Sequence, residues 1–196
     1  VTTSMRGDSK VVKLTNTYVG VKILDKGSVA PAFINFATPW VYAIEDIDAC
    51  DGGVYGDTTF TYKPDAIKGV FKRTQGDAPE NAHIIAYIWT GTFKSPIAQT
   101  GSDGKTSTRI QTDVDRAVMG RPDAGTVTGD GKLIASCDYA FATTKNNDWE
   151  EIVVPIDYKL TDVAPTKMNV IISSADYWNR GVMVENSTLE VDDVQF

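Results

Sequence analysis

The clearest candidates for ligand chemistry lie in the segment 82–93, which reads AHIIAYIWTGTF. In an extended strand successive side chains point to opposite faces, so His83, Tyr87 and Trp89 share one face, and the alternating positions are aliphatic. Flat aromatic rings stack on the C–H faces of pyranose sugars, and polar tips beside them can bond the hydroxyl groups. If the aliphatic face lines the core, these three residues form an exposed sugar-binding platform. The alternative is that the aromatic face is itself core.

A second candidate is the polar segment 175–181, which reads ADYWNRG and follows an expected strand. Tyr177 and Trp178 offer stacking surfaces there, and Arg180 offers a planar set of hydrogen-bond donors. Aromatic residues in a loop have fewer packing reasons than those in a strand. The sequence therefore predicts that Tyr177, Trp178 and Arg180 contact a carbohydrate. The alternative is that the rings anchor the loop to the core.

Sugar hydrolysis normally requires two carboxylates, about 5–5.5 Å apart for retention or about 6.5–9.5 Å apart for inversion. Glu150 and Glu151 are adjacent, and the segment 190–195 reads EVDDVQ, close to a three-carboxylate pattern of some jelly-roll glycanases. Its last position is Gln195, however, so the third carboxylate is missing. We assign no catalytic residue from the sequence. A carboxylate pair that converges only in the folded chain stays the alternative.

The last residues also predict a β-bulge. Four apolar side chains in this segment favour burial, namely those of Leu189, Val191, Val194 and Phe196. Alternation can place all four on the buried face only if the register shifts near Asp192. A carboxylate at such a bulge can bind a structural calcium ion, which takes oxygen ligands. The alternative is a bulge held by hydrogen bonds. No cofactor is required by the sequence, and calcium at Asp192 is the one metal site that it suggests.

Composition excludes several other classes of protein. One histidine and two cysteines are too few for a multi-histidine or cysteine-rich zinc site. The signatures of nucleophile-elbow hydrolases, zincins and P-loop enzymes are absent. The net charge of −7 opposes binding to nucleic acid and to anionic membranes, and no apolar run is long enough to insert into a bilayer. Cys50 and Cys137 could form a disulfide or be two buried thiols.

These residues need a β framework to hold them. The chain has 20 Val, 15 Ile and 22 Thr against 5 Leu, and 20 Asp against 6 Glu, which favours strands joined by turns. Without repeats, linkers or amphipathic helices, the pattern predicts one domain over 1–196, an all-β antiparallel sandwich of two sheets with jelly-roll topology. Alternation predicts strands over 10–15, 32–37, 58–63, 66–73, 82–93, 132–141, 149–158, 167–174 and 187–196.

The segment 112–130 is the least strand-like part of the chain, with four glycines or prolines between 120 and 129. It has room for one helical turn around Val114–Met119. Long loops in sandwiches often border binding sites. We therefore expect this loop to lie near a site, without a specific role for its residues.

Four blocks in this order resemble a known family: Phe60–Arg73, Trp149–Tyr158, Pro165–Ser174 and Ser187–Phe196. Together they are similar to the Bacteroidetes "putative carbohydrate metabolism domain", a jelly-roll module at the C-terminus of exported proteins, which is sometimes labelled a glycoside hydrolase. The segment 112–130 matches no family pattern, and Asn186-Ser187 stands where the family usually has Gly-Ser.

The resemblance implies a galactose-binding or carbohydrate-binding-module type of sandwich that recognises an oligo- or polysaccharide in bacterial polysaccharide utilisation. It also implies export, to the periplasm, the outer-membrane surface or the extracellular space, and a preceding N-terminal domain in the same protein. The alternatives are a glycoside hydrolase with a carboxylate pair and a surface adhesion or assembly domain.

Overall fold

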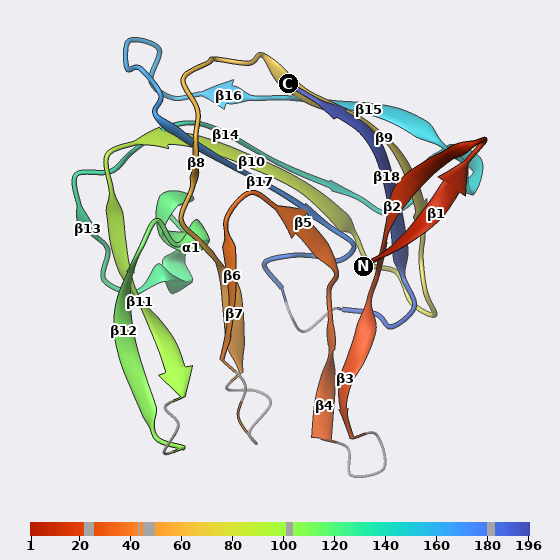
Figure 1. Ribbon diagram of the computed structural model, residues 1–196, viewed down its shortest axis with the longest axis horizontal. Helices are drawn as coiled ribbons and strands as arrows, with labels where there is room; N and C mark the ends of the chain where they lie inside the picture. The colour runs from red at the N-terminus through yellow and green to blue at the C-terminus, as the bar shows by residue number, and fades with distance from the viewer. Residues whose placement is uncertain (22–25, 43, 45–49, 101–103, 180–182) are drawn as a thin grey trace.

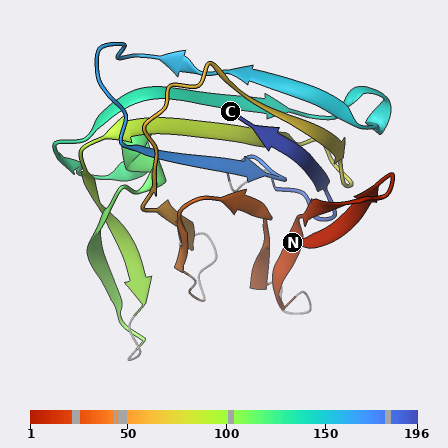
Figure 2. The ribbon, with the colours of Figure 1, turned by 45° about the horizontal axis from the view of Figure 1, so that its top comes forward.

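The computed structural model describes residues 1–21, 26–42, 44, 50–100, 104–179 and 183–196. Most strands lie in two antiparallel sheets that enclose a common apolar core, as Figures 1 and 2 show from two directions. The predicted all-β, two-sheet sandwich is therefore confirmed. Jelly-roll topology stays a prediction.

Both sheets mix strands from distant parts of the chain, and every strand pair in them is antiparallel. The first sheet has the order β1 (Thr2–Arg6), β2 (Ser9–Thr15), β18 (Thr188–Gln195), β9 (Ala66–Thr74), β15 (Glu150–Pro155). The second sheet has the order β16 (Asp157–Tyr158), β14 (Lys132–Phe141), β10 (Ala82–Thr90), β17 (Lys167–Ser173), β5 (Phe33–Asn35), with β8 (Thr58–Thr59) paired to β17.

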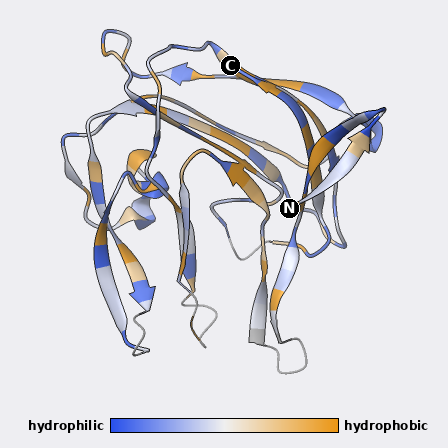
Figure 3. Ribbon diagram, in the orientation of Figure 1, coloured by the Kyte–Doolittle hydropathy of each residue, from blue (hydrophilic) through white to orange (hydrophobic). Residues whose placement is uncertain are grey.

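The core between the sheets follows the alternation of the strands. From the first sheet, Ile67 and Phe71 of β9 point inward, and from the second sheet Ile84, Ala86 and Ile88 of β10 meet them. All five are at most 1% exposed. Of the two arrangements that the sequence left open for 82–93, the structure has the one in which the aliphatic face lines the inter-sheet core. Figure 3 shows the hydrophobic stretches along these sheet strands.

Three further ribbons extend from one side of the sandwich (Figure 1), and the alternation did not predict them. They are β3 (Thr17–Val21) with β4 (Lys26–Ala30), β6 (Thr38–Tyr42) with β7 (Asp51–Tyr55), and β11 (Phe93–Thr100) with β12 (Thr106–Thr112) and β13 (Thr128–Gly129). Their residues lack a consistent apolar face, as in β12, where six of seven residues are exposed. Pairing with a neighbouring strand, rather than burial, holds such strands together.

The segment 112–130 forms the predicted helical turn, α1 (Asp115–Val118), followed by the 3-10 turn η3 (Pro122–Ala124). A second 3-10 turn, η4 (Lys145–Asn147), lies elsewhere. Asp113 fixes the start of α1, because its carboxylate accepts the N–H of Phe93 at 2.9 Å and the Nζ of Lys167 at 2.6 Å. The segment is therefore tied to the second sheet and packs against its outer face.

The end of the chain has the predicted bulge. The register of β18 against β9 shifts between Asp192 and Gln195, while Leu189 and Val191 are buried. Phe196 departs from the expectation, because it is 47% exposed. Its ring lies at the surface, where it contacts the rings of Phe36 and Phe60.

The two cysteines do not form a disulfide. Cys137 lies in the inter-sheet core, and burial raises the pKa of its thiol to about 11. Cys50 lies at the edge of β7, beside Ile44. In the part of the chain that the structure describes, no helix has the length and apolar character needed to cross a membrane.

Candidate functional site

Tyr87 and Trp89 do not form an exposed platform: both side chains are 0% exposed, and the prediction is wrong on this point. The outer face of the second sheet is covered by a second apolar cluster, in which Val54 of β7 and Val118 of α1 pack against the two rings. The Tyr87 hydroxyl accepts a hydrogen bond from Asn169 Nδ2 at 2.7 Å. Both faces of β10 are therefore core, and these rings cannot touch a ligand in this structure.

His83 is also buried, at 7% exposure, but it connects the sheet to the candidate loop. Its Nδ1 lies 2.9 Å from Asp138 Oδ1 of β14, and its Nε2 lies 3.5 Å from Asp176 Oδ1. Asp176 also accepts the backbone N–H of Trp178 at 3.1 Å. His83 thus holds the loop in place and has no direct access to a ligand.

Tyr177 and Trp178 lie where the loop prediction placed them, half-buried at the surface. Their ring centroids are 4.8 Å apart in an edge-to-face arrangement. The indole N–H of Trp178 donates to Asp138 Oδ2 at 2.7 Å, and the guanidinium of Arg121 lies 4.7 Å from the indole centroid. Arg180, the third predicted contact, lies outside the described residues.

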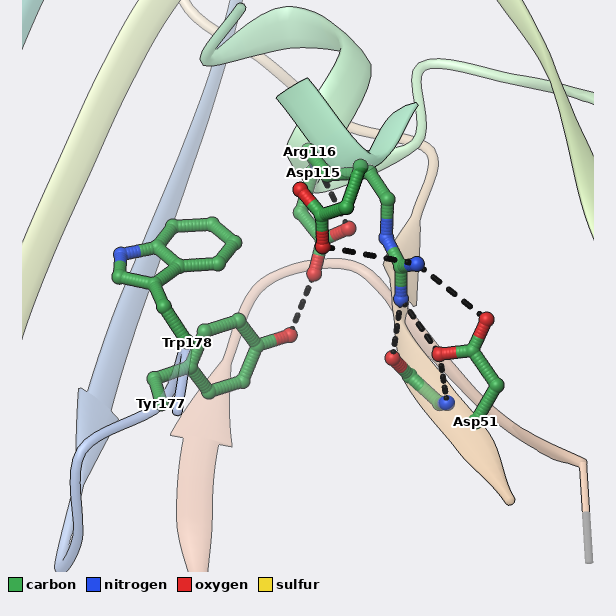
Figure 4. Close-up of a pocket in the computed structure, with 7 residues that line it drawn as sticks. Asp51, Asp115, Arg116, Tyr177 and Trp178 are labelled. Atoms are coloured by element: carbon green, nitrogen blue, oxygen red, sulfur yellow. Dashed lines mark hydrogen bonds and ion pairs between the residues drawn. The ribbon is translucent and has the colours of Figure 1, made fainter. Parts of the chain in front are cut away.

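These two aromatic residues form one wall of a pocket of about 320 Å³ (Figure 4). The other residues come from β7 and from the adjacent turns α1 and η3. Three segments distant in sequence, 51–52, 115–123 and 177–178, therefore meet there. The pocket is lined by Asp51, Gly52, Asp115, Arg116, Asp123, Tyr177 and Trp178.

Arg116 spans the pocket from α1 to β7, as Figure 4 shows. Its Nη2 donates to Asp51 Oδ1 at 2.7 Å and to the Gly52 carbonyl at 2.8 Å, and its Nη1 donates to Asp51 Oδ2 at 3.2 Å. Such a two-pronged pair fixes both groups in one plane. The pair therefore forms a rigid polar floor with donors and acceptors at known positions.

Asp115 is the most enclosed carboxylate of the pocket, at 1% exposure. Its Oδ2 accepts the Tyr177 hydroxyl at 2.5 Å and the Val54 N–H at 3.1 Å, and its Oδ1 accepts the Arg116 N–H at 2.7 Å. Burial raises the pKa of Asp115 above its ordinary value, and these hydrogen bonds only partly counter it. Gly53 permits this arrangement, since a Cβ there would lie 2.7 Å from Asp115 Oδ2.

A second, larger pocket of about 450 Å³ adjoins the first, with Asp51, Gly52 and Tyr177 common to both. It lies between β4 and the β6–β7 ribbon. Its character is different, because most of its lining is apolar. The apolar residues that line it are Val29, Ala30, Pro31, Phe33, Pro39, Trp40, Val41 and Met183.

Asp192, the predicted calcium ligand, pairs with Arg6, whose Nη1 lies 2.5 Å from Asp192 Oδ2 and 3.1 Å from Asp193 Oδ2. The positive charge of Arg6 opposes a cation at these carboxylates. Among the described residues, no group of three or more His, Cys, Asp or Glu side chains could hold a metal ion. Structural calcium at Asp192 stays a prediction.

Sequence reasoning missed Asp51, Asp115, Arg116 and Asp123. Two weak signals pointed toward them. Asp115 and Arg116 lie in the helical turn of the segment that was expected to border a site, and Asp51 begins a run, Asp-Gly-Gly, that reads as a turn but forms the start of β7. Their convergence is long-range, since Arg116 and Asp51 are 65 residues apart in sequence.

No protein-family model matches the chain, and no curated protein matches it. Two solved structures share its fold, each described as a "putative glycoside hydrolase". The structure from Bacteroides thetaiotaomicron is 12% identical with a TM-score of 0.60, and the match covers 96% of this chain and 53% of that one. The structure from Bacteroides vulgatus is 14% identical with a TM-score of 0.61, and the match covers 98% of this chain and 76% of that one.

At these identities the likeness shows the fold alone. The chain spans about half the length of the first neighbour and about three quarters of the second. The neighbours' names agree with the glycoside hydrolase label that the sequence resemblance carries. The named family itself stays a prediction.

Proposed function

We propose that this domain binds carbohydrate in the pocket between β7, α1 and the Tyr177–Trp178 loop. The observation that carries the proposal is that two half-buried rings lie beside a fixed arginine–carboxylate pair, Arg116 and Asp51, in one concavity. Rings accept the C–H face of a pyranose, and charged donors and acceptors bond its hydroxyls. The fold shared with two proteins named as glycoside hydrolases supports a sugar as the ligand.

Binding fits the pocket better than hydrolysis. Both oxygens of Asp51 are engaged by Arg116, and both oxygens of Asp115 accept hydrogen bonds from the protein. A nucleophile or a general base needs a carboxylate oxygen that can reach the substrate or a water molecule. Asp123 is more open, with 56% of its side chain exposed. Among the described residues, however, the other carboxylates that line the pocket are those of Asp51 and Asp115, and both are engaged by protein donors.

The test is a glycan array probed with the domain, followed by titration of the best ligand by calorimetry. We expect Trp178→Ala to weaken binding by at least about tenfold, because one face of the stacking site is lost. The matched control is Tyr62→Ala, which removes a 74% exposed aromatic ring that does not line the pocket. Equal binding by both variants and the wild type would overturn this location.

Glycoside hydrolysis is the second candidate, and Asp115 is the observation that favours it. A carboxyl group whose pKa is raised by burial is the kind of group that protonates a leaving oxygen. The measurement is release of nitrophenol from a panel of para-nitrophenyl glycosides by the wild type and by Asp115→Asn. Turnover by the wild type that disappears in the variant would replace binding by catalysis as the function.

The biological setting belongs to the same proposal. We propose that the domain works outside the cytoplasm, in the periplasm, at the outer-membrane surface or in the extracellular space, as a module attached to an N-terminal domain. The partial coverage of the first structural neighbour is compatible with a modular arrangement. Cell fractionation with an antibody against the domain tests the location.

A further inference from the structure

The larger pocket bears on which class of carbohydrate the site accepts, an inference that rests on the proposed function. This pocket is continuous with the polar one, because Asp51, Gly52 and Tyr177 line both. The Tyr177 ring lies at the junction: its hydroxyl donates to Asp115, and its ring packs edge-to-face with Phe33 at a centroid distance of 5.5 Å. A molecule long enough to pass Tyr177 would therefore meet a polar half and an apolar half.

The two halves differ in chemistry. In the part of the chain that the structure describes, the polar half is lined by three carboxylates and one guanidinium, which suits hydroxyl groups and disfavours an anionic sugar. The apolar half is lined by aliphatic side chains, two prolines, Phe33 and Trp40. Among the described residues, its only charged lining residue is Asp51, and both oxygens of that carboxylate face Arg116.

We propose that the site recognises a neutral sugar that carries an apolar substituent, with the sugar in the polar pocket and an alkyl or aryl aglycone in the apolar one. A volume of about 450 Å³ is in the range of small-ligand sites and holds a short alkyl chain or a single aromatic ring. Burying such a group removes apolar surface from water on both partners. The occupant is thus an amphipathic glycoside rather than the inner part of a plain polysaccharide.

The rim of the apolar pocket offers a substitution that keeps the fold. Val41 of β6 lines this pocket and is 79% exposed, so a polar side chain there costs little stability. Val19 of β3 is a matched control, because it is also a strand valine, is 62% exposed and does not line either pocket. Val41→Asp and Val19→Asp therefore differ in where the new charge lies.

The experiment is calorimetric titration with methyl, hexyl and phenyl glycosides of the sugar that binds best in the array, below the critical micelle concentration. For the wild type we expect the hexyl and phenyl glycosides to bind at least about tenfold tighter than the methyl glycoside. Val41→Asp should remove most of that gain and leave the methyl glycoside unaffected. Val19→Asp should behave as the wild type.

The other outcomes separate the two proposals. If methyl and hexyl glycosides bind equally, the apolar subsite is overturned and carbohydrate binding stands. If no glycoside binds at all, the proposed function fails and this inference fails with it. If hexanol without a sugar competes as well as the hexyl glycoside, the apolar pocket acts alone and the amphipathic ligand is overturned. A second variant, Ala30→Phe, fills the pocket and should also abolish the gain.

Discussion

The molecule contains two Tyr–Trp pairs that look alike in composition and differ in position. Tyr87 and Trp89 lie two residues apart on β10 and are 0% exposed. Tyr177 and Trp178 are adjacent in a loop and remain half-buried. Tyr177 and Trp178 pack partly on the same apolar cluster that encloses Tyr87 and Trp89. Tyr87 and Trp89 are thus enclosed in the core, whereas Tyr177 and Trp178 lie at the surface and line the pocket.

The strand pair is enclosed because β10 is buried on both faces. The β6–β7 and β11 ribbons, together with α1, add a further layer over the second sheet, so its aromatic face becomes core. The loop after β17 lies beside that layer, and its rings pack partly against it while remaining half-buried. The aromatic pair in the loop therefore lines an open pocket, whereas the strand pair is enclosed.

The largest difference between the pairs should be seen in stability. Trp89 is fully enclosed, and its indole N–H has no hydrogen-bond partner within the described ranges, so the ring contributes by packing. We expect Trp89→Ala to lower the free energy of unfolding by about 3–5 kcal/mol, because it leaves a large cavity. Trp178→Ala should cost at most about 2 kcal/mol, since its ring is only partly removed from water. Urea denaturation followed by circular dichroism measures both, and equal losses would contradict the assignment of roles.

For the tyrosine hydroxyls the order of the stability costs should be reversed, with the loop residue more sensitive than the strand residue. Tyr177 donates to the buried carboxylate of Asp115, and Tyr177→Phe should cost about 1–3 kcal/mol, because that carboxylate loses a donor. Tyr87 accepts from the neutral amide of Asn169, so Tyr87→Phe should cost only about 1 kcal/mol. The same denaturation experiment compares them. A larger loss for Tyr87→Phe would indicate that Asp115 is held by its backbone donors alone.

Asp115, which accepts the Tyr177 hydroxyl, should make the stability of the protein depend on pH. Burial raises the pKa of Asp115 in the folded protein, so the fold favours the protonated carboxyl group. This contribution is complete below the unfolded pKa of about 3.9 and is lost as the pH rises through the higher folded value. Asp115→Asn cannot ionise, so its stability relative to the wild type should increase as the pH rises from about 4 through the higher folded pKa. Thermal unfolding across this range measures the trend, and a flat difference would show that the pKa is not raised.

Asp138, which holds Trp178, should show the opposite sign. Burial by itself raises its pKa, but the hydrogen bond and charge of His83, the N–H of Trp178 and the charge of Arg121 outweigh burial, so the pKa of Asp138 lies below its ordinary value. Its contribution to stability is complete above the unfolded pKa of about 3.9 and is lost as the pH falls through the lower folded value. The advantage of the wild type over Asp138→Asn should therefore shrink below about pH 4. An advantage that grows on acidification would reverse this assignment.

Much of the sandwich was predictable because alternation is a local property. The segment 132–141 was predicted as a strand and forms β14 over the same residues, and 167–174 was predicted one residue longer than β17. The segments 82–93 and 149–158 were each predicted as one strand but contain a break, after Thr90 and after Pro155. The β6–β7 ribbon was missed because it has no regular apolar face.

The candidate site was only partly predictable. Tyr177 and Trp178 were identified because aromatic residues in a polar loop are hard to explain by packing. Asp51 and Arg116 carry no local signal, since a carboxylate in a glycine-rich run and an arginine in a short helical turn are common on any surface. They are candidate site residues because of the two-pronged contact between them, which exists only when β7 and α1 lie side by side.

The sequence alone determined the β class of this protein and the separation of aliphatic and aromatic side chains onto opposite sides of the strand at 82–90, because side-chain alternation is fixed by backbone geometry within a few residues. Only the tertiary structure decided that both of these sides are buried, and that β7, α1 and the Tyr177–Trp178 loop enclose a common pocket. Those decisions depend on contacts between segments more than 60 residues apart, such as Arg116 with Asp51 and Tyr177 with Asp115, which no local pattern encodes.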